Sequence, residues 1–239
     1  MRSDKAFDTL YTRFGFGGKS LSMRMPAFSL LVAALSLAAN SQTPPEKEPA
    51  KANSRPAEQQ KKAEPFDGAD VATMAKKCVT LDTDAGIIIA EMYPEHAPES
   101  VRSFLNIAEL GDLNTTTFDR VVPGFVIQGG NFWTREGGVT FEIGSRGRRT
   151  LPDEPNKVLH TRGILSMARG EEANTATTNF FILVGDSPHL DGSFAAFGKV
   201  IKGMDVVDAI NKAEVNDEKP AKPVRIKTAT VSPCASTPR

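Results

Sequence analysis

The sequence predicts a mainly β domain, a barrel or sandwich of short strands capped by two α-helices. Three observations indicate this class. Short β-branched and aromatic runs recur between turn signals over residues 78–234. Apolar residues fall at helical spacing in only two segments of that region. No internal repeat divides it, so residues 78–234 are expected to form one domain.

The first two strands are expected at residues 79–84 and 86–92, where β-branched runs flank the turn signal Asp84-Ala85-Gly86. The later strand candidates are residues 118–122, 126–129, 164–167, 180–183, 196–200 and 225–232. One helix is predicted between Pro98, which opens it, and Gly111, which ends it. The second is predicted over residues 204–212, with Val207 and Ile210 on its buried face.

The N-terminal part differs in kind. Residues 28–39 (FSLLVAALSLAA) are an apolar run after the basic Arg24, followed by small residues, which is typical of a secretory signal and too short to span a bilayer. Residues 1–41 are therefore interpreted as an extension and a signal peptide, with translation starting at Met23 or Met25. Residues 42–77, rich in Pro, Ala, Glu and Lys, are predicted to be a disordered linker. Residues 235–239 form a C-terminal tail.

Composition excludes several kinds of partner and site. The chain has 29 basic and 29 acidic residues and no cluster of basic and aromatic side chains, so no nucleic acid is expected to bind. The histidines, His96, His160 and His189, lack metal-ligand spacing. Ser166 lacks the context of a hydrolase nucleophile. No metal and no cofactor are predicted.

Residues 118–130, FDRVVPGFVIQGG, resemble the central signature of cyclophilins, the cyclosporin-binding class of peptidyl-prolyl cis-trans isomerases. Further similar segments follow in the family's order: GILSMAR at 163–169, TNFFIL at 178–183, LDG at 190–192 and FGKV at 197–200. The helix sequence PESVRSFLNIAELG is also similar to the family's first helix. The resemblance covers residues 79–232. It implies a closed eight-stranded antiparallel β-barrel with a helix over each open end and a substrate groove on the outer wall.

The chemistry of the implied reaction explains the residue types. Rotation about a peptide bond has a barrier of about 18–20 kcal/mol, and X-Pro bonds exchange slowly although cis and trans are close in energy. A charged donor aimed at the prolyl nitrogen stabilises the twisted amide more than either planar isomer. The resemblance assigns that donor to Arg120, whose guanidinium stays charged. Gln128 matches the glutamine that hydrogen-bonds the substrate backbone.

The resemblance also implies a substrate groove and shows where this chain departs from the family. Phe125, Val126, Phe181 and Leu190 match the apolar pocket for the proline ring, and the backbone around Ala168 and Arg169 is the expected rail for the substrate chain. The departures are Arg169 for Asn, Asn179 for Gln, His189 for Trp and Phe194 for His or Tyr. Because that Trp contributes to cyclosporin binding, cyclosporin is predicted to bind weakly while isomerase activity is kept.

The two cysteines acquire meaning from the implied fold, in which the terminal strands lie side by side. A register that places Cys78 opposite Cys234 would allow a disulfide between them in an oxidising compartment. The expected protein is an exported bacterial cyclophilin, periplasmic or alternatively secreted. It would be a monomer without stable membrane insertion after signal cleavage, and its partners would be proline-containing polypeptides and unfolded exported proteins.

Two alternatives differ in function. A proline-peptide-binding chaperone of the same fold would bind without turnover; the intact Arg120, Phe125 and Gln128 argue against it, and Asn179 and Phe194 favour it. A lipocalin-like carrier would need a hollow barrel, whereas the Phe, Ile and Leu content predicts a filled interior.

Overall fold

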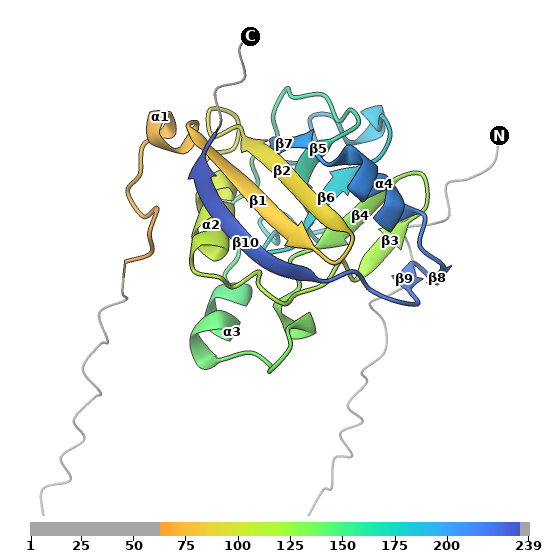
Figure 1. Ribbon diagram of the computed structural model, residues 1–239. Coiled ribbons are helices and arrows are strands. Elements are labelled where there is room, and N and C mark those ends of the chain that lie inside the picture. Colours follow the sequence, from red (N-terminus) through yellow and green to blue (C-terminus); the bar gives the residue numbers. More distant parts are fainter. Residues whose placement is uncertain (1–62, 235–239) are drawn as a thin grey trace, which may run out of the picture. The chain divides into compact units, whose positions relative to one another are not determined.

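The computed structural model describes residues 63–234. Eight strands form one antiparallel sheet in the order β10-β1-β2-β7-β5-β6-β4-β3 (Figure 1). Their bounds are β1 (Lys77–Thr83), β2 (Gly86–Met92), β3 (Arg120–Val122), β4 (Val126–Gly129), β5 (Ile164–Met167), β6 (Phe180–Leu183), β7 (Ala196–Lys202) and β10 (Ile226–Pro233). All eight predicted strands are confirmed, and β2, β4, β5 and β6 have the predicted bounds.

The two faces of the sheet bury different clusters because neighbouring residues in a strand point to opposite sides. In the β3-β4-β6-β5 part, Val121, Ile127 and Ile182 lie opposite one another and enter the main core. That core also holds the fully buried side chains of Phe104 and Phe197, so the space inside the curved sheet is filled. A hollow, carrier-like interior is therefore excluded.

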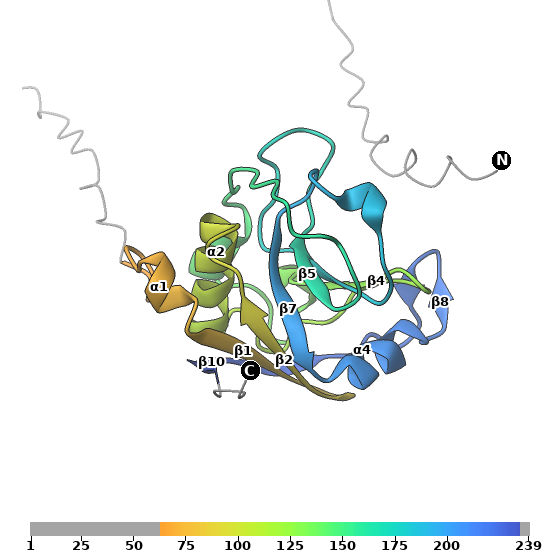
Figure 2. The same cartoon turned by 90° about the horizontal axis from the view of Figure 1, so that it is seen from above.

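The two predicted helices are confirmed as α2 (Pro98–Glu109) and α4 (Met204–Asn211). They are well separated, with strands between them (Figures 1 and 2). The α2 N-cap residue, Ala97, supplies no capping side chain. Instead, the Glu154 carboxylate accepts hydrogen bonds from the backbone N–H groups of Glu99 and Ser100, at 2.9 and 2.8 Å.

Several short elements were not predicted: α1 (Val71–Met74), α3 (Phe141–Gly147) and the 3₁₀ turns η1 (Phe132–Thr134) and η2 (Pro188–Leu190). Helix α3 has no apolar face that would show helical spacing, since its first residue, Phe141, is 81% exposed. No helix within residues 63–234 is long and apolar enough to cross a membrane.

Residues 64–74 correct the predicted linker. The prediction that a disordered linker extends to residue 77 is wrong for this part, because Phe66 and Met74 are buried in the main core. Glu64, also buried, forms a bidentate ion pair with Arg149 at 2.8–2.9 Å. Arg102 donates to the Phe66 carbonyl at 2.7 Å. Two widely spaced apolar side chains are too few to produce a periodic signal. Residues 42–62 lie outside the described residues.

The hairpin of β8 (Val215–Asn216) and β9 (Lys219–Pro220) was also not predicted. Asn216 pairs with Lys219, so Asp217 and Glu218 form a two-residue turn. Both have positive φ, 49° and 63°, as a type I′ turn requires. The hairpin lies beside β3 (Figure 1).

The structure joins Cys78 and Cys234 by a disulfide, with their Cα atoms 4.9 Å apart. The register expected for them is wrong by two positions, because Cys78 lies opposite Ser232 in the β1–β10 pair. Cys234 follows the end of β10, and its N–H donates to the carbonyl of Lys76. The bond therefore links the ends of the two strands diagonally. The predicted extension and signal peptide (1–41) and the tail (235–239) lie outside the described residues.

Candidate functional site

A row of side chains crosses the outer face of the sheet, opposite the main core. Strand pairing places Arg120 opposite Gln128, Gln128 opposite Phe181, and Phe181 opposite Ser166. Directly paired residues share one face. Arg120 Nη1 donates to Gln128 Oε1 at 3.2 Å. The two residues expected to contact the substrate amide are thus neighbours, at one end of a strip that continues into apolar side chains.

The strip continues as an apolar cluster that is separate from the main core, here called the outer-face cluster. Its buried members are Val126, Ile164, Phe181, Leu183, Leu190 and Ala196, and its partly buried members are Tyr93, Val122, Phe125, Val158, Ala168 and Phe194. Phe181 and Phe194 make an edge-to-face pair with ring centroids 6.1 Å apart. The exposed His189 lies against Phe125 at 5.6 Å between centroids. All the apolar residues assigned to the proline pocket therefore come together.

A tight turn between β3 and β4 presents Phe125 to this cluster. Gly124 has φ 75°, and the Phe125 N–H donates to the Val122 carbonyl, as in a type II turn. Asn211 at the end of α4 holds the turn in place, because its Oδ1 accepts a hydrogen bond from the Gly124 N–H at 2.8 Å. Its Nδ2 donates to the carbonyls of Val122 and Val126. Helix α4 thereby holds the hairpin that carries Arg120.

A second partner of Arg120 comes from the β8–β9 hairpin. The Arg120 Nε donates to Glu218 Oε2 at 2.7 Å. The two side chains are 34% and 40% exposed. The Glu218 carbonyl also accepts from the Val121 N–H at 2.8 Å, so the hairpin is tied to β3 by backbone as well as side chain.

Arg169 and Asn179 lie at the other end of the cluster. The Arg169 guanidinium stacks 4.9 Å from the centre of the Phe194 ring and donates to the Ser193 carbonyl at 3.3 Å. The Ala168 N–H donates to the Asn179 carbonyl at 3.0 Å. Within the described residues the buried Asn179 Oδ1 has no hydrogen-bond partner. The Asn179 side chain is one methylene shorter than the Gln of the family, and its amide oxygen makes no hydrogen bond to the described residues.

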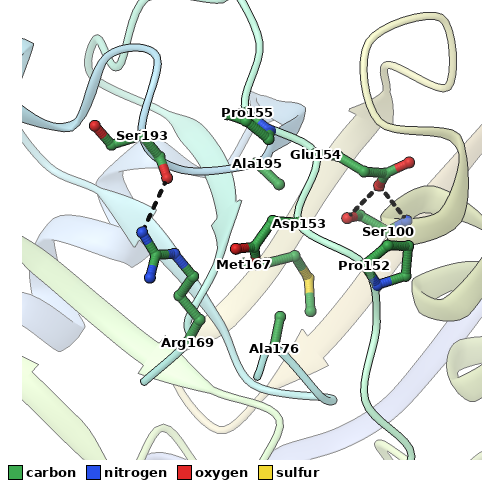
Figure 3. A pocket seen from close by; sticks show the side chains of 10 residues that line it. All are labelled: Ser100, Pro152, Asp153, Glu154, Pro155, Met167, Arg169, Ala176, Ser193 and Ala195. Atoms are coloured by element: carbon green, nitrogen blue, oxygen red, sulfur yellow. Dashed lines mark hydrogen bonds between the residues drawn. The ribbon is translucent and has the colours of Figure 1, made fainter. Parts of the chain in front are cut away.

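A small cavity lies beside Arg169. Figure 3 shows it between the loop that carries Glu154 and the side chains of Met167, Arg169 and Ala195. Its volume is about 10 Å³, enough for roughly one water molecule. The cavity is therefore too small to hold a substrate side chain in this conformation.

His160 is buried and contacts β5 and the residue that follows Leu190. Its Nε2 lies 3.1 Å from Ser166 Oγ, and its Nδ1 lies 3.1 Å from Asp191 Oδ1. Burial lowers the pKa of His160, and the hydrogen bond to the Asp191 carboxylate opposes this shift only in part. Ser166 and His160 have 0% and 1% of their surface exposed, so Ser166 cannot act as a nucleophile on a polypeptide. The chain of contacts ties β5 to the segment that presents Leu190.

Asn211 and Glu218 were missed by sequence reasoning. Asn211 lies in the predicted second helix, but helical spacing gives no role to a polar residue at its end. The Asn216-Asp217 dipeptide is a turn signal that could have predicted the β8–β9 hairpin. No local signal places either residue next to β3, whose contacting residues precede them by 89 and 98 positions.

Comparison with known proteins identifies the family. The family model described as "Cyclophilin type peptidyl-prolyl cis-trans isomerase/CLD" matches residues 78–231, more than half of the chain. The chain belongs to the cyclophilin family. This cyclophilin is 36% identical over 171 residues to peptidyl-prolyl cis-trans isomerase B of Escherichia coli, a match that covers 64% of this chain and 99% of the relative. Peptidyl-prolyl cis-trans isomerase A of Dickeya dadantii is 35% identical over 167 residues, covering 64% and 83%.

Solved structures agree. A cyclophilin type peptidyl-prolyl cis-trans isomerase of Cryptosporidium parvum, crystallised in the presence of the dipeptide Ala-Pro, matches this cyclophilin with a TM-score of 0.57 and 29% identity. The match covers 65% of this chain and 98% of that one. The predicted reaction class is confirmed: this cyclophilin is a peptidyl-prolyl cis-trans isomerase.

Proposed function

We propose that this cyclophilin is an exported isomerase in which Arg120 stabilises the twisted X-Pro amide. The observation that carries the role of Arg120 is its place on the outer face. Its guanidinium is held beside Gln128 at the edge of the apolar cluster, and the hydrogen bonds of the described residues use Nε and Nη1 and leave Nη2 unused. Nη2 is therefore the nitrogen that donates to a bound substrate.

The mechanism needs no bond to break. The partners are proline-containing polypeptides, whose proline ring packs on the outer-face cluster around Phe125 and Phe181. A proline ligand is in keeping with the similar Cryptosporidium parvum protein, which was crystallised in the presence of the dipeptide Ala-Pro. Gln128 and the backbone near Ala168 hold the substrate chain. As the amide twists, the prolyl nitrogen gains a free lone pair, and the Arg120 guanidinium stabilises that lone pair more than it stabilises either planar isomer.

The groove is expected on the outer wall of a closed barrel. Support for closure comes from the two edges of the eight-stranded sheet. The Phe118 N–H, just before β3, donates to the Val224 carbonyl, and the Ile226 N–H of β10 donates to the Thr116 carbonyl. Backbone pairing of this kind removes exposed edges of a sheet.

Export is supported by the signal-like residues 28–39 together with the disulfide between Cys78 and Cys234. The expected result is a periplasmic protein that begins near residue 42 and has no free thiol. N-terminal sequencing and thiol counting on the unreduced periplasmic fraction measure both, with a Cys78→Ser, Cys234→Ser double variant as the control for thiol labelling. A protein that stays in the cytoplasm with both thiols free would reject export.

Cyclosporin is expected to inhibit weakly, because the exposed His189 replaces the indole that contributes to cyclosporin binding in the family. An isomerase assay with a cyclosporin titration measures this. His189→Trp should strengthen inhibition about tenfold or more while the uninhibited rate changes little. Equal inhibition of the wild type and His189→Trp would show that His189 is not the cause of weak cyclosporin binding.

The rival activity, a peptide-binding chaperone without turnover, is tested by the same assay. If X-Pro isomerisation with the protein is no faster than in buffer alone, while a proline peptide binds measurably, the chaperone is favoured.

A further inference from the structure

The Glu218 carboxylate contacts the Arg120 guanidinium at a different nitrogen from the one that contacts Gln128. Glu218 accepts from Nε at 2.7 Å, and Gln128 accepts from Nη1 at 3.2 Å. A guanidinium is planar, so contacts at two of its three nitrogens fix both its position and its plane. The remaining nitrogen, Nη2, then points in one direction instead of sweeping through the rotamers open to a long side chain.

The backbone of Glu218 shows that its place is not explained by local stability. It is the second central residue of the turn between β8 and β9, and its φ is 63°. Positive φ at this position strongly favours Gly, and a side chain there costs free energy. Sequences that break a local rule of this kind do so most often at functional sites. The carboxylate at Glu218 reaches Arg120, which a Gly could not do.

The hairpin around Glu218 is well placed to act as a support. The Glu218 carbonyl accepts from the Val121 N–H, so the turn is held against the strand that carries Arg120. The distance between the two side chains therefore depends little on movement of the loop. Since both side chains are more than one-third exposed, the ion pair itself adds little to stability.

We propose that Glu218 is a positioning residue for isomerisation, which orients Arg120 so that Nη2 faces the prolyl nitrogen. The proposal rests on the proposed role of Arg120. A positioning role of Glu218 differs from a purely structural role in one respect: loss of the carboxylate should lower kcat/KM without lowering the stability of the fold.

The test uses Glu218→Gly and Glu218→Gln in the full mature chain. Glu218→Gly creates the favoured Asp-Gly turn, so we expect a melting temperature raised by about 2–4 °C and kcat/KM lowered by about tenfold, mainly in kcat. Glu218→Gln keeps an acceptor without charge and should lie between wild type and Glu218→Gly. Asp217→Asn is the matched control: it removes one negative charge from the same turn at a residue that does not contact Arg120, and should leave kcat/KM unchanged.

A double-mutant cycle separates this proposal from the role of Arg120. If Glu218 acts through Arg120, Glu218→Gly should have no further effect on kcat/KM in an Arg120→Ala background. An equal effect in both backgrounds, unchanged catalysis in Glu218→Gly, or a rise in kcat would overturn the positioning role. Full activity of Arg120→Ala would instead reject the role of Arg120 itself.

Discussion

Arg120→Ala is expected to lower kcat/KM for X-Pro isomerisation by about 10²–10³-fold, the cost typical of removing one transition-state donor. The loss should fall mainly on kcat, because the outer-face cluster that binds the proline ring is untouched. An isomerase assay on a proline-containing peptide measures it. The free energy of unfolding should change by less than about 1 kcal/mol, since the ion pair with Glu218 is partly exposed.

Two further variants sharpen this expectation. Arg120→Lys keeps the charge but lacks the planar guanidinium whose separate nitrogens contact Glu218 and Gln128, so its activity should lie between those of wild type and Arg120→Ala. Arg162→Ala removes a different exposed arginine, paired with Asp208, and should leave activity unchanged. Activity in Arg120→Ala within threefold of wild type would contradict electrostatic stabilisation by this residue.

Phe66→Ala is expected to lower the free energy of unfolding by about 3–5 kcal/mol, and Met74→Ala by about 2–5 kcal/mol. Both side chains lie in the main core although they precede the region of family similarity. Replacing them leaves cavities in that core. Chemical denaturation of the disulfide-bonded protein gives both values, provided that the dependence of the free energy of unfolding on denaturant concentration (the m value) is the same for the variants and the wild type.

Val71→Ala is the control for these two variants. Val71 lies in the same segment but is 42% exposed, so its replacement should change stability by no more than about 0.5 kcal/mol. Changes that small in all three variants would mean that the folded domain begins near residue 78 after all. Isomerase activity measured well below the unfolding transition should be retained in each, because none of the three residues contributes to the outer-face cluster.

Strands and the two long helices were predictable because each carries a local signal. The run from Gly86 to Met92 is β-branched between turn residues, and Pro98 marks a helix start. Residues 64–74 carried no such signal, because their burial depends on Arg102, Asn106 and Arg149, which lie far along the chain. The register of β1 on β10 was misjudged by two positions, a shift that preserves the face of every side chain and so leaves the hydrophobic pattern unchanged.

The candidate site was predictable as far as its motif extends. Arg120, Phe125 and Gln128 lie within one thirteen-residue segment, and strand pairing brings Phe181 to them. Glu218 and Asn211 support that segment from outside it. Their contacts depend on where a short hairpin and a helix end come to lie in three dimensions, which no spacing in the sequence encodes.

The disulfide between Cys78 and Cys234, which are 156 positions apart, closes the domain into a covalent ring that includes every residue of the candidate site. A pulling force applied to the chain on either side of that ring passes through the sulfur–sulfur bond and bypasses the sheet. The same ring keeps fragments together when a protease cuts one of its loops. The oxidised protein should therefore resist mechanical unfolding and the loss of fragments after limited proteolysis. Residues 64–74 lie outside the ring, so a pulling force can still detach them from the core.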